Sequence, residues 1–160
     1  MGDVERLVET EFDRFVRIVA AVCGSVATAE DATATAFASA WEREQRGDAF
    51  TNLPGWVLTA ALRRSRSVWR RRQAEARAYQ RMKVERPEPS DPDHALDLQA
   101  ALRRLPKRQQ ETVALHYLLG FDVAAVAATL GVSTGTVKTA LSRARSKLAL
   151  SLAVPEEVDS

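Results

Sequence analysis

Residues 122–148 read DVAAVAATLGVSTGTVKTALSRARSKL, and this stretch determines the fold of the C-terminal half. Asp122 and Ser133 stand where a side-chain oxygen can cap each of two successive helices. Gly131 lies between the helices and permits the left-handed backbone of a tight turn. Small and apolar residues follow the spacing that fills the crossing point of two helices, namely Val126, Ala127, Leu130, Val132, Val137 and Leu141. The pattern predicts a helix-turn-helix.

The second helix of this motif, predicted over residues 134–152, has a polar face opposite its apolar row. Such a face can enter a DNA major groove, where Lys138 can donate to guanine acceptors. Arg143 and Arg145 flank the face and are expected to meet phosphates, which position a helix without reading sequence. The predicted DNA-binding residues are Ser133, Thr134, Gly135, Lys138, Thr139, Ser142, Arg143 and Arg145. A helical hairpin without a DNA role remains the alternative.

Charge is divided along the chain, although the net charge is only +2. Residues 51–86 carry a net +8 and residues 102–150 a net +6, whereas residues 1–50 carry −5. Two separated basic blocks suggest two contacts with one polyanion, because each Lys or Arg beside a phosphate releases counterions. From charge alone, two solvated helix faces are an equally good interpretation.

The remainder of the chain is also predicted to be helical. Apolar residues at steps of three and four mark amphipathic helices, and helices are predicted over residues 5–23, 28–46, 54–81, 93–104 and 106–119. A capping box at Thr28–Asp31 is expected to start the second helix. That helix is expected to present Phe37, Ala40 and Trp41 to a core.

The helix predicted over residues 54–81 has a core face beside an arginine stripe. Pro54 suits its first turn, because the missing amide proton leaves no donor unpaired. At about 100° per residue, one face collects Val57, Leu58, Ala61, Leu62, Ser65, Val68 and Trp69. The neighbouring face collects Arg63, Arg66, Arg70, Arg77 and Arg81. This helix is therefore expected to be the basic element of the N-terminal half.

The segment RPEPSDPD at residues 86–93 divides the chain, since it holds three of the six prolines and no apolar residue. We therefore expect an all-α protein of two small helical domains, residues 1–83 and 94–153. A short flexible linker over residues 84–93 would join them, and residues 154–160 would form a tail.

The sequence argues against enzyme, metal-site and membrane classes. It has no Gly-rich phosphate loop and no nucleophile beside a base, so no enzymatic activity and no cofactor are expected. His94 and His116 stand apart from each other with no Cys or carboxylate cluster at ligand spacing, and Cys23 lies among small apolar residues as a buried hydrophobe would. No segment is apolar enough to span a membrane, and the acidic N-terminus is unlike a signal peptide, which predicts a cytoplasmic protein.

Two sets of motifs carry a family resemblance. The C-terminal half contains Leu105-Pro106, Arg108-Gln109, Gly135–Lys138 and Ser142–Arg145. The N-terminal half contains Ala29–Asp31, Phe37, Ala40-Trp41, Trp56-Val57 and Ser65–Arg72. In these motifs, and in their order over nearly the whole chain, the protein resembles the extracytoplasmic-function sigma factors of bacterial RNA polymerase.

The resemblance implies a sigma factor that directs core polymerase to promoters and initiates transcription. The first domain would be sigma region 2, which docks on the clamp coiled coil of the β′ subunit and melts the minus-ten element. The second would be sigma region 4, which contacts the β flap and reads the minus-thirty-five element. The implied polymerase-binding residues are Glu30, Asp31, Phe37, Ser39, Trp41 and Glu42. The implied minus-ten residues are Trp56, Arg63, Arg66 and Arg70, and an anti-sigma factor is a further expected partner.

Five positions depart from the family pattern. Ala34 and Thr35 replace polar residues implied to contact polymerase, and Arg63 replaces an asparagine. Ala140 replaces an arginine of the recognition helix, and Ala125 replaces a glutamate of the helix before it. Two other functions therefore stay open. One is a helix-turn-helix regulator that binds DNA without recruiting polymerase, and the other is a degenerate paralogue that sequesters a partner.

Overall fold

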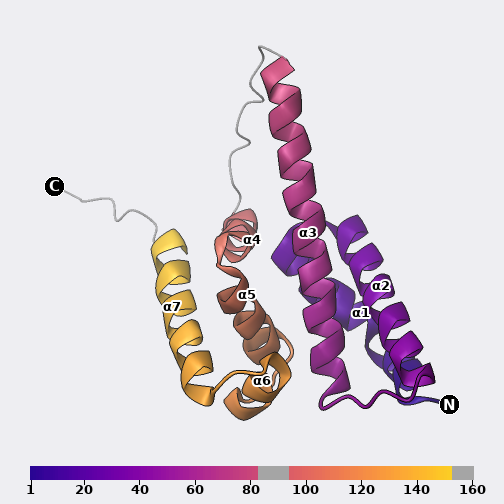
Figure 1. Ribbon diagram of the computed structural model, residues 1–160. Helices are drawn as coiled ribbons and strands as arrows, with labels where there is room; N and C mark the ends of the chain where they lie inside the picture. Colours follow the sequence, from indigo (N-terminus) through magenta and orange to yellow (C-terminus); the bar gives the residue numbers. More distant parts are fainter. Residues whose placement is uncertain (83–93, 153–160) are drawn as a thin grey trace. The chain divides into compact units, whose positions relative to one another are not determined.

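The computed structural model describes residues 1–82 and 94–152. The chain forms two compact units, Met1–Asp91 and Pro92–Ser160, and the described residues contain seven α-helices and one π-helical segment (Figure 1). The prediction of an all-α fold in two helical domains is confirmed. The predicted linker (84–93) and tail (154–160) lie outside the described residues.

The N-terminal unit is a bundle of three helices, α1 (Asp3–Cys23), α2 (Val26–Gln45) and α3 (Leu53–Met82), each packed on the other two (Figure 1). The apolar stripe of α1 faces inward, and burying it removes large side chains from water, the main favourable term in folding. The fully buried large side chains of this unit are Val4, Phe15, Val19, Val22, Val57, Leu58 and Leu62.

Helix α2 begins earlier than the sequence pattern predicts. Gly24 closes α1 in the left-handed conformation (φ 77°), and the Ser25 hydroxyl directly after it accepts a hydrogen bond from the Thr28 amide at 3.2 Å. The capping box predicted at Thr28–Asp31 is therefore wrong, because Ser25 caps the helix first. Thr28 is buried instead, and its hydroxyl accepts a hydrogen bond from Arg72 of α3 at 2.9 Å.

The start of α1 is capped by the end of α2. One carboxylate oxygen of Glu44 accepts hydrogen bonds from the backbone amides of Asp3, at 2.9 Å, and Val4, at 3.3 Å. A negative charge at this place also complements the positive end of the helix dipole. Gly2 leaves room for this contact, since a Cβ there would lie 2.5 Å from the Glu44 carboxylate.

Helix α3 is longer than α1 and α2, and only its N-terminal part packs in the core of the bundle. Figure 1 shows α3 continuing well beyond the ends of α1 and α2. Core packing extends from Val57 to Ser65, but Trp69 is 39% exposed and all residues over 71–82 are exposed. The prediction that Trp69 joins the core is therefore wrong, because the buried face of α3 ends at Ser65.

The C-terminal unit contains α4 (His94–Arg104), α5 (Lys107–Val113), the π-helical segment η1 (Ala114–Leu118), α6 (Val123–Leu130) and α7 (Thr134–Leu152). Helix α7 packs against α4, α5 and α6. The buried residues that join these elements include Leu102, Leu105, Leu115, Val126, Val137, Leu141 and Ala144. The predicted helix over residues 106–119 thus becomes an α-helix that continues into a wider π turn.

The helix-turn-helix forms as the sequence predicts. Asp122 accepts a hydrogen bond from the Ala125 amide at 2.7 Å, and Ser133 accepts one from the Thr136 amide at 3.1 Å. Gly131 adopts the left-handed conformation with φ 68°. Each of these three residues therefore fixes one end of a helix, and α6 packs against α7.

Candidate nucleic-acid interface

The outer face of α7 is polar and exposed. Its buried row is Val137, Ala140, Leu141 and Ala144, while Leu148 is only half-buried. All eight residues predicted to bind DNA are exposed, namely Ser133, Thr134, Gly135, Lys138, Thr139, Ser142, Arg143 and Arg145. The face has the composition of a recognition helix, with a cation and hydroxyls able to reach base edges.

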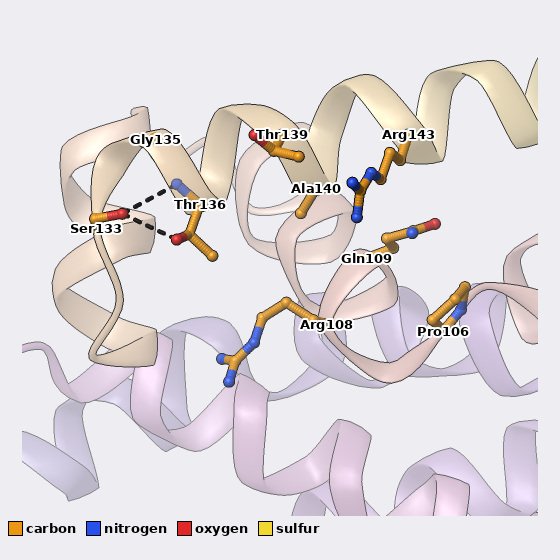
Figure 2. Close-up of a pocket in the computed structure, with 9 residues that line it drawn as sticks. All are labelled: Pro106, Arg108, Gln109, Ser133, Gly135, Thr136, Thr139, Ala140 and Arg143. Atoms are coloured by element: carbon orange, nitrogen blue, oxygen red, sulfur yellow. Dashed lines mark hydrogen bonds between the residues drawn. The ribbon is translucent and has the colours of Figure 1, made fainter.

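A cleft of about 500 Å³ lies between the start of α5 and this face (Figure 2). Arg108 from α5 and Arg143 from α7 contribute the charges, and Ser133, Thr136 and Thr139 contribute hydroxyl groups. Two cations beside hydroxyl donors are the groups that protein surfaces use to hold a DNA phosphate. The cleft therefore extends the interface from α7 onto α5.

Gln109 and Glu111 support this cleft from within the core. Gln109 is only 8% exposed, and its carbonyl oxygen is buried with no hydrogen-bond partner among the described residues. Arg143 extends from α7 toward Gln109 (Figure 2). Glu111 is almost completely buried, and its carboxylate lies 3.9 Å from the Arg108 guanidinium, where it restrains that side chain. Arg108 and Gln109 belong to a motif noted in the sequence, but the sequence did not predict that these residues lie close to α7.

Ala140, where the family pattern has arginine, lies at the wall of the same cleft (Figure 2). Its side chain is 6% exposed. The departure therefore falls at the junction of α5 and α7, and the short side chain leaves the cleft open.

Arg145 makes a contact that the sequence did not predict. Its Nη1 donates to the Tyr117 hydroxyl, on η1, at 2.7 Å. Arg143 and Arg145, expected to act alike, therefore lie in different surroundings.

An aromatic cluster lies at the start of α3 in the N-terminal unit. The rings of Phe50 and Trp56 meet edge to face with centroids 5.2 Å apart, and the Arg43 guanidinium lies 5.4 Å from the first centroid and 5.2 Å from the second. Asp48 holds Arg43 through an ion pair of 3.5 Å. The sequence indicated only Trp56. Arg43 and Phe50 join the cluster because the loop between α2 and α3 brings Phe50 next to Arg43 of α2, which a sequence pattern does not show.

The arginine stripe of α3 begins at Arg63, about two helical turns after Trp56. Arg63 and Arg70 are exposed, and Arg66 is half-buried. Neighbouring Arg64 lies 3.6 Å from the Asp31 carboxylate of α2, so one of the residues implied to bind polymerase is already paired within the unit. The stripe presents its positive charge to solvent along one side of α3.

The two aromatic residues of α2 were both predicted to face the core, and only Phe37 does so. Phe37 is buried and stacks near Phe12 and Phe15, with centroid distances of 5.9 and 5.7 Å. Trp41 was expected in the core but is 46% exposed, because α1 begins beside it and leaves a groove there. The surface thus has one accessible aromatic residue, and Glu30, Ser39 and Glu42 are also exposed on α2.

The groove next to Trp41 has a volume of about 350 Å³. Its apolar lining consists of the buried Val4 and Phe37 together with Val8, Ala38 and Trp41, and the exposed Glu5 and Glu9 also line it. An apolar groove with an acidic rim is complementary to a basic amphipathic helix.

Among residues 1–82 and 94–152, no helix is long and apolar enough to cross a membrane. No group of three potential metal ligands occurs in this part of the chain.

Comparison with known proteins finds relatives of this chain. Residues 95–148 match the model for sigma-70, region 4. A relative aligned along 92% of the chain, the ECF RNA polymerase sigma factor SigE of Mycolicibacterium smegmatis, is 31% identical over 157 residues. The chain is related to the extracytoplasmic-function sigma factors. The resemblance in the sequence motifs is thereby confirmed.

Another relative of this family is the sigma factor EcfG of Rhodopseudomonas palustris, 33% identical over 108 residues and covering 65% of the chain. The chain spans about 60% of the length of these two curated sigma factors, 60% for EcfG and 61% for SigE.

Two solved structures show the same fold. The sigma factor RpoE from Bartonella quintana, in complex with the anti-sigma factor NepR, gives a TM-score of 0.69 at 24% identity, covering 97% of this chain and 99% of that one. CnrH, in complex with the cytosolic domain of CnrY, gives a TM-score of 0.67 at 21% identity, and the match covers 92% of this chain and 85% of that one.

Proposed function

We propose that this chain is a transcription initiation factor that brings RNA polymerase core to promoter DNA. The observation that carries the proposal is the exposed polar face of α7, which belongs to a complete helix-turn-helix and adjoins a cleft with two arginines. The factor would supply recognition and strand separation in the cytoplasm without being an enzyme and without a cofactor, while polymerase supplies catalysis.

The C-terminal unit would read the minus-thirty-five element. Lys138, Thr139 and Ser142 would face base edges, and Lys138 has the reach to donate to guanine. Arg108 and Arg143 would hold a backbone phosphate in the cleft between α5 and α7, which fixes the position of the helix. Sequence preference and phosphate contact would thus reside on different side chains of one surface.

The N-terminal unit would melt the minus-ten element. An unstacked base needs an aromatic or guanidinium plane to replace the stacking that it loses, worth about 1 to 3 kcal/mol per base. The cluster of Arg43, Phe50 and Trp56 offers such planes. Arg63, Arg66 and Arg70 would hold the phosphates of the separated strands along α3.

The outer face of α2 would bind RNA polymerase core, at the clamp coiled coil of β′, and the C-terminal unit would contact the β flap. Trp41 would provide the anchoring contact, since exposed aromatic side chains in grooves are frequent hot spots of interfaces. Glu30, Ser39 and Glu42 would make polar contacts elsewhere on the exposed surface of α2. Phe37 would act from the core by supporting Trp41.

Complexes of two structural relatives make an anti-sigma factor a further proposed partner, since RpoE is seen with NepR and CnrH with CnrY. The regulator that binds DNA without polymerase explains α7 equally well. It assigns no role to the Trp41 groove or the arginine stripe, and we therefore favour the initiation factor.

Run-off transcription tests the proposal. Core polymerase and the full chain would be mixed with a pool of random promoters, and the templates that yield transcripts would be recovered and sequenced. We expect transcripts that depend on the chain and share two spaced elements. DNA binding without core binding would favour the regulator, and core or anti-sigma binding without transcripts would favour the degenerate paralogue.

A matched pair of variants tests the polymerase contact. Trp41→Ala should weaken binding to core at least about tenfold, as expected for a hot spot. Val26→Ala removes another exposed apolar side chain of α2, 61% exposed, and should leave the affinity unchanged. Equal effects of the two substitutions would contradict the assignment of Trp41.

A further inference from the structure

Tyr117 and Arg145 form a hydrogen-bonded pair on one flank of α7. Both side chains reach the surface, Tyr117 being 49% exposed, and their bond is short at 2.7 Å. With Ser142 taken as zero and about 100° per residue, Arg145 lies at about −60° and Arg143 at about +100°. The pair therefore lies on the opposite side of the recognition face from the Arg108–Arg143 cleft.

The π turn fixes Tyr117 in this position. The Leu119 amide bonds to the Ala114 carbonyl at 2.9 Å, five residues back, which rotates the following side chains relative to α5. The Tyr117 ring meets the His116 ring edge to face at 4.8 Å, and His116 Nδ1 lies 2.7 Å from the Phe121 carbonyl oxygen. Tyr117 is thus held by contacts within its own turn as well as by Arg145.

The hydrogen bonding of the pair leaves donors for a ligand. The Tyr117 oxygen accepts from Arg145, so the hydroxyl proton is not used in this bond. The Arg145 guanidinium has five N–H groups, and this bond uses one. Lys138 lies at about −40° on the same flank. A hydroxyl and two cations on a surface without a neighbouring carboxylate on α7 favour an anion with several oxygens.

We infer that Tyr117 and Arg145 bind a phosphodiester of DNA, on the strand across the major groove from the phosphate in the Arg108–Arg143 cleft. This inference rests on the proposed entry of α7 into the groove, because a helix seated there has a phosphate backbone on each side. Tyr117 donates its proton to the phosphate and orients the guanidinium, which supplies the charge. The helix is then held at both flanks, which fixes its rotation about its own axis.

A double-mutant cycle in the full chain tests the inference, with binding to a short duplex measured by fluorescence anisotropy at several salt concentrations. Arg145→Met should lower the slope of log affinity against log salt by about 0.9, the effect of one phosphate contact. Tyr117→Phe removes only the hydroxyl and should weaken binding about three- to tenfold with little change of slope. In the Arg145→Met background, Tyr117→Phe should have a smaller effect, because only the hydrogen bond from its own hydroxyl to the phosphate is left to lose.

The controls separate this inference from the function on which it depends. If the wild-type chain does not bind duplex DNA, or Arg143→Met leaves its slope unchanged, the proposed function fails. If the wild type binds and Arg143→Met lowers the slope, while Tyr117→Phe and Arg145→Met bind as tightly as wild type, the pair only holds α7 to η1 and the inference is wrong. Should Arg145→Met fail to fold, the nearly isosteric Tyr117→Phe decides alone: undiminished affinity overturns the inference.

Discussion

Replacing Arg108 and Arg143 by Met should flatten the salt dependence of DNA binding without changing which sequences are preferred. Each phosphate contact contributes about 0.9 to the slope of log affinity against log salt. Between 50 and 200 mM salt, one contact therefore changes affinity by about 3.5-fold. The double variant should lose that share of the salt sensitivity, because both guanidinium groups line one cleft and would hold one phosphate between them.

The assay is fluorescence anisotropy with a duplex that carries the selected upstream element and with a scrambled duplex. Lys138→Met is the contrasting variant, and it should reduce the preference between the duplexes at a cost of about 1 to 3 kcal/mol. Arg17→Met, exposed on α1, controls for loss of a positive charge outside the interface. An unchanged slope in the Arg108 and Arg143 double variant, or an equal loss with Arg17→Met, would refute the assignment of the cleft.

Three further substitutions test other parts of the structure. Gly131→Ala should destabilise the C-terminal unit by about 1 kcal/mol, because a Cβ is unfavourable at φ 68°, and thermal unfolding should shift down by about 4 to 8 °C. Glu44→Ala should destabilise the N-terminal unit by about 1 kcal/mol, since two amides of α1 lose their cap, and Glu44→Gln should lose less in the same melt. Ala140→Arg should fold normally, because the cleft has room for the side chain, and should raise the anisotropy-derived salt slope by about 0.9.

Much of the fold could be predicted because its determinants are local. Asp122, Gly131 and Ser133 act on backbone within four residues of themselves, so their roles are visible in the sequence. The misplaced start of α2 has a local cause too, since Ser25 and Thr28 both can cap and only the preceding turn at Gly24 selects between them.

The parts that the sequence did not reveal depend on relative lengths and long-range contacts. Helical periodicity placed Trp41 and Trp69 on core faces, but it cannot say where a neighbouring helix begins or stops. The same limit applies to the site. Tyr117 and Arg145 are 28 residues apart, and their contact depends on a π turn that no residue pattern predicted.

The distal part of α3 has a thermodynamic consequence. Over residues 71–82 the helix is exposed on every side, so its order does not come from burial. An isolated helix of this length is only marginally stable in water, because the hydrogen bonds of a few turns barely offset the free-energy cost of nucleation. Its amides should exchange with solvent at a small local opening free energy, while those of α1 and α2 should require global unfolding of the bundle. Arg77 and Arg81 therefore lie on a segment that a bound polyanion would stabilise as a helix, so that hydrogen exchange there would report on ligand binding.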